Sequence, residues 1–254
     1  MVNRVTWIAQ VAVLCCVGLG GVARAEQFRV ENRIFVGDEK EPRSESTTIF
    51  YDDVVYDFLV KPAEITIFDK AHDRFVLLDV PRRVKTEVPM AHVREFAGRL
   101  KQWGSTQPDA MLKFLVDPRF EERNDAGEMI FSSPWLTYRV MTEDAGNEAV
   151  SRQYSEFSDW YSQLNTLLNP GTRPPFARMV VNAALEARQR FPREVHLTLR
   201  SKDSLLSRRI TIRSEHQLIG QLIQPDRERV SQTDQYIAIF TPLKFDEYQK
   251  KIEK

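Results

Sequence analysis

The residues best able to coordinate a metal lie in one short segment, Asp69-Lys-Ala-His72-Asp73, which places three oxygen or nitrogen donors within five positions. Asp and His are also common in turns between strands, because an Asp side chain accepts hydrogen bonds from nearby backbone amides and tolerates unusual dihedral angles. The other histidines, His92, His196 and His216, occur singly, whereas metal sites usually combine ligands at fixed spacings. We therefore expect a turn at 69–73, with no metal ion and no other cofactor.

Signatures of hydrolases and nucleotide-binding proteins are missing from the sequence. It contains no Gly-x-Ser-x-Gly, no Gly-x-x-x-x-Gly-Lys, no Gly-x-Gly-x-x-Gly and no His-Glu-x-x-His motif, each of which supports a specific chemistry. The 36 carboxylates leave open an acidic pair that only the fold brings together, as in glycoside hydrolases. We assign no catalytic residue and expect a protein that is not an enzyme.

Aromatic residues suggest a second kind of chemistry, a platform for a carbohydrate or a lipid. Five of them stand out, at Trp103, Trp135, Phe157, Trp160 and Tyr161. Their spacing follows the periodicity of helices or strands, and aromatic side chains dominate protein cores as well as interfaces. We therefore expect these five side chains to pack in the core.

The first 25 residues are typical of a secretory signal peptide. Arg4 precedes an apolar stretch at 5–22, and Ala23-Arg-Ala25 supplies small residues where signal peptidase cleaves. The alternative is a retained membrane anchor, which Gln10 and several glycines weaken. We expect cleavage after Ala25, export to the periplasm or the outside, and no membrane span in the remaining chain, 26–254.

Charge and cysteine content narrow the choice further. Both cysteines, Cys15 and Cys16, lie in the signal segment, and the residues before them match a lipoprotein attachment site poorly. Cleavage would leave 34 basic and 36 acidic residues and no thiol, so that the mature chain would be stabilised by packing without disulfides. A nearly neutral chain lacks the basic excess of a nucleic-acid binder. We expect no nucleic-acid partner.

Residues 27–89 are typical of a meander of about six antiparallel strands. Apolar and charged residues alternate along the first, and short polar turns separate the rest, for example Asp52-Asp53 between 47–51 and 54–60. Two later strands, at 65–68 and 75–78, are apolar on both faces. Such strands must be covered on both faces, by helices, by a second sheet or by a bound apolar ligand.

Helices and further strands follow in alternation. Met90–Trp103, ended by Gly104, and Pro175–Arg190 carry apolar stripes with helical spacing. The other expected elements are helices at 109–115 and 155–168, an acidic loop at 118–128, strands at 129–131, 136–142, 149–154, 194–199 and 208–212, a helix from Asp226 to Phe240 whose last five residues could instead form a strand, and a marginal charged tail at 244–254. Residues 26–254 are therefore expected to form a single α+β domain, a curved antiparallel sheet packed with several helices.

The strands Val54-Val-Tyr-Asp-Phe58, Glu64-Ile-Thr-Ile-Phe-Asp69 and Arg74-Phe-Val-Leu-Leu-Asp79 lie in an exported chain that begins with a meander. In this the protein resembles the periplasmic lipoprotein-carrier and lipoprotein-sorting-like proteins, over about a quarter of the mature chain. In that family an antiparallel sheet curls into a half-barrel closed by helices, and its concave face holds acyl chains. The resemblance implies a non-catalytic carrier whose partner is a lipid or a lipoprotein.

If an apolar ligand lies within the sheet, the side chains expected to line its site are Ile65, Ile67, Val76 and Leu78. The alternative is that these side chains contact the helices at 90–103 and 175–190. Two other functions stay open, an exported hydrolase with an acidic site assembled by the fold, and an envelope protein that binds a partner through an exposed apolar patch. The sequence leaves the oligomeric state unassigned.

Overall fold

The computed structural model describes residues 26–125, 127–200 and 209–250. It confirms an α+β fold built on an open, curved sheet of twelve strands in this part of the chain. Within the described sheet, neighbouring strands are antiparallel except for the pair β6 and β12. The order across the sheet is β12-β6-β5-β4-β3-β2-β1-β11-β10-β9-β8-β7. The strands are β1 Phe28–Val36, β2 Ser44–Tyr51, β3 Val54–Leu59, β4 Glu64–Asp69, β5 Arg74–Asp79, β6 Val84–Pro89, β7 Glu121–Asp125, β8 Glu128–Ser132, β9 Leu136–Asp144, β10 Arg190–Arg200, β11 Arg209–Ile219 and β12 Thr241–Pro242.

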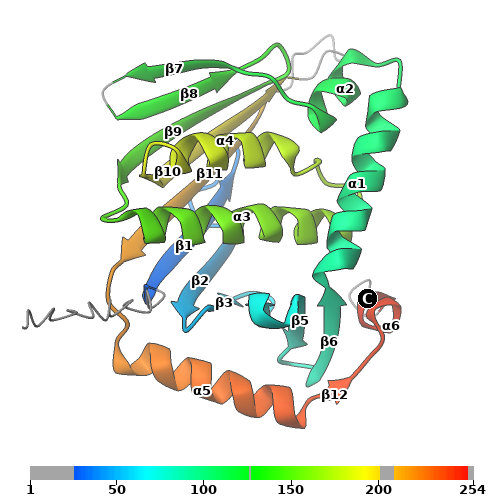
Figure 1. The fold of residues 1–254 in the computed structure, drawn as a ribbon, viewed down its shortest axis with the longest axis vertical. Helices are drawn as coiled ribbons and strands as arrows, with labels where there is room; N and C mark the ends of the chain where they lie inside the picture. Colours follow the sequence, from blue (N-terminus) through cyan, green and yellow to red (C-terminus); the bar gives the residue numbers. More distant parts are fainter. Residues whose placement is uncertain (1–25, 126, 201–208, 251–254) are drawn as a thin grey trace, which may run out of the picture.

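Four helices lie on one side of the sheet, which we call the inner face (Figure 1). Helices α1 and α3 cover the half formed by β1–β6, and α2 and α4 cover β8–β10. The opposite side is the outer face, and α5 lies against part of it. The helices are α1 Met90–Thr106, α2 Ala110–Val116, α3 Glu148–Leu168, α4 Phe176–Glu186, α5 Gln224–Ile239 and α6 Phe245–Lys250, with a short 3-10 turn at Lys70–His72.

The predicted meander is confirmed, since β1 to β6 are consecutive antiparallel neighbours. The hairpin turn between β2 and β3 contains Asp52 and Asp53, both at positive φ, 46° and 64°. A two-residue turn with both φ angles positive matches the right-handed twist of the strands that it joins, and Asp tolerates this conformation better than most residues. The local sequence therefore accounts for this half of the sheet.

The expectation that strands β4 and β5 are covered on both faces is also confirmed. Phe68, Phe75 and Leu77 point to the inner face and pack in one core cluster with α1 and α3. Ile65, Ile67, Val76 and Leu78 point to the outer face and pack in a second cluster with α5. The cover on the outer face is therefore α5, and not the helices at 90–103 and 175–190.

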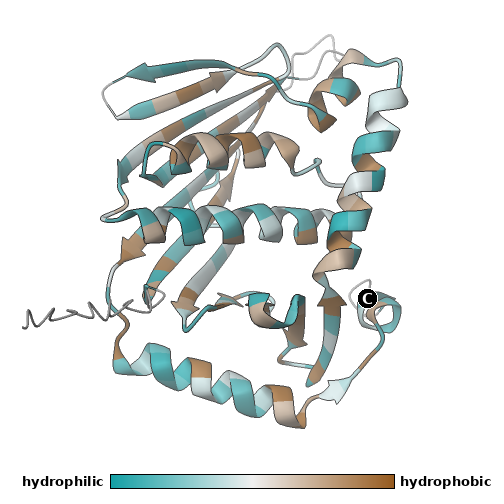
Figure 2. Cartoon of the chain, viewed as in Figure 1, coloured by the Kyte–Doolittle hydropathy of each residue, from teal (hydrophilic) through white to brown (hydrophobic). Residues whose placement is uncertain are grey.

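Two predicted elements are wrong in type. The expected acidic loop contains β7, an edge strand that is exposed and hydrophilic along its length (Figure 2). Because neither of its faces is buried, it lacks the alternation by which a strand is recognised, and its charges protect the sheet edge from pairing with another chain. The expected strand at 149–154 is instead the first part of α3, which the Asn147 side chain caps by accepting a hydrogen bond from the Val150 amide at 2.9 Å.

The predictions for Gly104 and Trp103, near the end of α1, are wrong. The helix does not end at Gly104 but continues to Thr106. Gly104 instead allows a close approach between α1 and α2. A Cβ atom at Gly104 would lie 2.4 Å from Val116 Cγ1. The neighbouring Trp103 is 52% exposed instead of packed in the core. Phe157, by contrast, is buried as expected.

The chain end was expected to be marginal, but it contains α6, whose Tyr248 is 2% exposed and packs in the inner core. The predicted signal peptide, residues 201–208 and the last four residues lie outside the described residues. Among the helices that the structure describes, none combines the length and the apolar character needed to cross a bilayer.

Candidate ligand-binding site

The four side chains predicted to line a ligand site are buried in the outer-face cluster. Ile65 pairs with Leu78, and Ile67 with Val76, across β4 and β5. Their exposed fractions are between 0% and 6%, and Val230 and Phe240 are buried in the same cluster. The structure therefore brings all four together, but places a helix of the protein itself over them.

A cleft of about 810 Å³ opens near Ile65, where β3 ends and β4 begins. The end of α3 with the loop behind it, and α6, form its other walls. Its lining comprises Leu59, Pro62, Glu64, Ile65, Thr66, Leu77, Leu168, Asn169, Pro170, Gly171, Thr172, Asp246, Tyr248, Gln249 and Lys250. The volume is within the range of roughly 300–1,000 Å³ that is typical of small-molecule sites.

The walls of this cleft are firmly attached to the core. Leu77 is 3% exposed and belongs to the inner-face cluster, opposite Thr66 in the sheet. Tyr248 anchors α6, because its ring is buried and the guanidinium of Arg82 lies 5.4 Å from the ring centre. The cleft is therefore formed by packed elements and is largely preformed.

The lining combines apolar side chains with polar and charged ones, among them the carboxyl group of Glu64. Leu59, Leu77 and Leu168 are from three different elements and supply apolar surface. Burial raises the pKa of Glu64, and the neighbouring Asp79 adds to this effect while Arg82 opposes it. Such a space can hold an extended apolar group and form hydrogen bonds to a polar group at one end.

A second group of polar residues forms a row across four adjacent strands beneath α3. Thr48 Oγ1 donates to Asp57 Oδ1 at 2.7 Å, and Asn32 Nδ2 donates to Thr48 Oγ1 at 2.9 Å. Asn32 Oδ1 lies 2.8 Å from His216 Nδ1, and Tyr154 Oη lies 3.4 Å from the same nitrogen. Asparagine, threonine and aspartate at inward positions of β1–β3 are the sequence signal that the prediction overlooked.

Burial favours the neutral forms of the titratable groups of this row. It raises the pKa of Asp57, against hydrogen bonds from Thr48, Ser46 and Tyr161. It lowers the pKa of His216 to about 3, with a further contribution from Arg178. A neutral His216 with its proton on Nδ1 donates to Asn32 Oδ1, and its Nε2 accepts from Ser214 Oγ at 3.0 Å. The row therefore acts as a hydrogen-bonded seam that fixes where α3 lies on the sheet.

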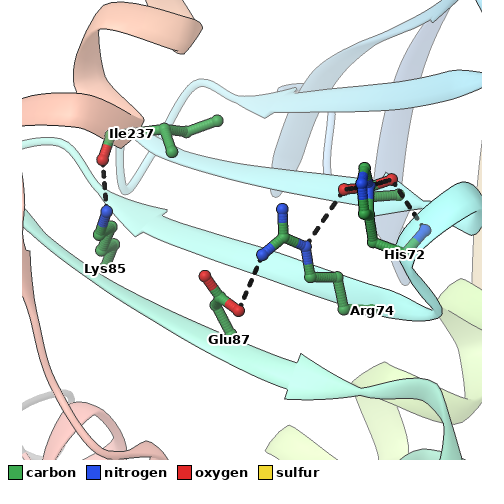
Figure 3. A network of polar contacts seen from close by, with 6 residues as sticks. His72, Arg74, Lys85, Glu87 and Ile237 are labelled. Carbon is green, nitrogen blue, oxygen red and sulfur yellow. Dashed lines mark hydrogen bonds and ion pairs between the residues drawn. The ribbon is translucent and has the colours of Figure 1, made fainter.

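The segment at 69–73 is a turn stabilised by ion pairs. The Asp69 carboxylate lies 2.8 Å from His72 Nδ1 and accepts from Arg74 Nε at 3.1 Å, and Arg74 reaches Glu87 at 2.9 Å (Figure 3). Burial raises the pKa of Asp69, but the hydrogen bonds from His72 and Arg74 outweigh it and lower the pKa. Among the described residues, no group of three His, Cys, Asp or Glu side chains is arranged to hold a metal ion.

A charged groove of about 680 Å³ crosses β1, β2, β10 and β11. Three of its carboxylates lie beside basic side chains: Glu31 beside Arg29 at 3.3 Å, Glu215 beside Arg33 at 2.9 Å, and Glu194 beside the His196 ring at 2.7 Å. Because these carboxylates already have partners within the protein, the cleft beside α6 is the stronger candidate for a ligand site. No protein-family model matches the chain, and no curated protein matches it in sequence.

Proposed function

We infer that this protein is an exported, non-catalytic binding protein that holds a lipid or acyl chain in the cleft between β3, β4, the end of α3 and α6. The observation that carries the proposal is this cleft of about 810 Å³, which leucines from three elements line. Apolar surface in a preformed cleft is favourable to cover, at roughly 25 cal/mol per Å² removed from water.

Two further features support the proposal. The signal-like segment at 1–25 supports export to the periplasm or the outside. The six-stranded meander with helices against its inner face supports the resemblance to lipoprotein carriers, and hence a lipid or a lipoprotein as partner. The proposed site differs from the expected one, because the ligand would lie on the inner face at the end of the sheet and not against Val76 and Leu78.

The experiment is native mass spectrometry of the mature protein purified from its host without detergent, before and after denaturation. We expect a bound mass that is lost on denaturation and extracts as lipid. Titration of the delipidated protein with a fluorescent monoacylglycerol, an acyl probe with an uncharged head group, should then show saturable uptake of one probe. A clean mass with no probe uptake would overturn the proposal.

A pair of variants locates the binding. Leu168→Trp places a larger side chain in the cleft and should weaken probe binding by about tenfold or more, equivalent to about 1.4 kcal/mol. Ile239→Trp is the control, because Ile239 is 60% exposed on α5 and does not line the cleft. Equal probe affinity for the two variants would show that the probe binds elsewhere.

A further inference from the structure

Glu64 occupies a special position in the proposed site. It is the first residue of β4, pairs with Asp79 of β5, and lines the cleft where the sheet ends. It also lines a smaller space of about 180 Å³ beside α5. Its side chain is therefore a half-buried carboxyl group that a molecule bound in the cleft can contact.

The charged neighbours of Glu64, Asp79 and Arg82, pair with each other, although Nη1 and Nη2 of Arg82 are buried without a hydrogen-bond partner. Asp79 takes hydrogen bonds from both the backbone and Nε of Arg82, at 2.8 and 2.5 Å. The Arg82 guanidinium also lies over the Tyr248 ring. Among the described residues, none donates a hydrogen bond to the Glu64 carboxyl group. With respect to the described part of the chain, the group therefore keeps free acceptor capacity at the surface of the cleft.

The charged side chains around the cleft are mainly acidic. Among the described residues, its charged lining comprises two carboxylates, Glu64 and Asp246, and one cation, Lys250. Lys250 is exposed, in the last turn of α6. Asp79, directly opposite Glu64 in the sheet, is a third carboxylate nearby, and its ion pair with Arg82 balances its charge. An anionic group that entered beside Glu64 would meet like charges in a partly desolvated site.

We propose that the cleft selects amphiphiles with a neutral or cationic head group that donates hydrogen bonds, such as an amine, an amide or a hydroxyl, and that Glu64 accepts those hydrogen bonds. The site correspondingly discriminates against anionic head groups, including free fatty acids and phosphate esters. This selectivity rests on the proposed function, because it concerns the polar end of a ligand whose acyl chain lies between the leucines.

The test compares three ligands with the same sixteen-carbon chain, hexadecylamine, monopalmitoylglycerol and palmitate, as competitors of a fluorescent acyl probe below their aggregation concentrations. Wild-type protein should bind the amine and the glycerol ester on the order of tenfold more tightly than palmitate. This ranking needs no variant, so it can be measured even if a substitution impairs folding. Equal affinities for all three would overturn the selectivity while leaving the binding function in place.

The variant Glu64→Gln removes the charge but keeps a group that accepts and donates hydrogen bonds. We expect palmitate to bind more tightly and hexadecylamine less tightly than to the wild-type protein, so that the ratio of their two affinities falls by about tenfold. Glu228→Gln, an exposed carboxylate of α5 outside the cleft, is the matched control and should preserve the ranking. A ranking unchanged in Glu64→Gln would overturn the role of Glu64. A wild-type protein that binds no probe would instead overturn the proposed function.

Discussion

Asp226 connects α5 to the sheet through two kinds of contact. Its side chain is 3% exposed, and both oxygens accept hydrogen bonds from Arg29 Nη1 on β1, at 2.8 and 2.9 Å. Oδ2 also accepts from the Ile223 amide at 2.9 Å, which satisfies a donor at the start of the helix. Asp226→Ala should therefore remove a helix cap and leave Arg29 without its main partner.

The magnitude follows from these two losses. A missing cap costs about 0.5–2 kcal/mol, and breaking a fully buried ion pair from one side costs about 3–5 kcal/mol. The second figure must be reduced, because the Arg29 side chain is 18% exposed and keeps a contact with Glu31 at 3.3 Å. We expect the free energy of unfolding to fall by about 3 kcal/mol in total.

The assay is urea denaturation followed by far-UV circular dichroism, together with a thermal melt. For a domain of this size the melting temperature should fall by about 6–12 °C. Asp234→Asn, an exposed carboxylate on the same helix, is the control and should change stability by less than about 0.5 kcal/mol. A loss below about 1 kcal/mol in Asp226→Ala would refute the reasoning. A double-mutant cycle with Arg29→Met should give a coupling energy above about 1 kcal/mol, whereas additive effects would show that the ion pair contributes nothing.

Three further outcomes are expected. Gly104→Ala should destabilise the protein by about 1–3 kcal/mol, because the new Cβ would overlap Val116. Gly98→Ala in the same helix has open space around the new Cβ and should stabilise the protein by about 0.5–1 kcal/mol. Denaturant midpoints that shift in the same direction for both variants would contradict this prediction. Burial raises the pKa of Asp159 from 3.8 to about 6, so between these pH values the folded state holds a proton that the unfolded state has lost. The free energy of unfolding should therefore fall as the pH rises from 3.8 to about 6, and Asp159→Asn should flatten this pH dependence. Burial lowers the pKa of His216 from 6.5 to about 3, so stability should fall as the pH drops from 6.5, and a profile unchanged in His216→Gln would count against this.

Much of the sheet could be predicted because its first half is built from local contacts. Each strand from β1 to β6 pairs with the next along the chain, so alternation and turn residues such as Asp52-Asp53 are sufficient to define the hairpins. The need for cover on both faces of β4 and β5 also follows from their composition. Which helix supplies that cover does not, because α5 is separated from those strands by more than 140 residues.

Each error of the prediction has an identifiable physical cause. β7 has no buried face, so hydrophobic periodicity cannot reveal a strand whose backbone alone is paired with β8. Residues 149–154 contain both helix- and strand-compatible types, and the cap at Asn147 decides between them. Gly104 reads locally as a helix end, although its role is to let Val116 approach. For β7 and Gly104 the deciding contact is with another element, whereas for residues 149–154 it is the local cap of the helix.

By itself, the sequence determined the α+β class, the meander and the signal-like beginning, because these depend on composition and on patterns within about ten residues. The tertiary structure decided where side chains meet. It placed Ile65, Ile67, Val76 and Leu78 under α5, and it opened a cleft beside Glu64 between segments that are distant in the chain. A cleft is the space left between packed elements, so its position depends on long-range contacts that no local pattern encodes.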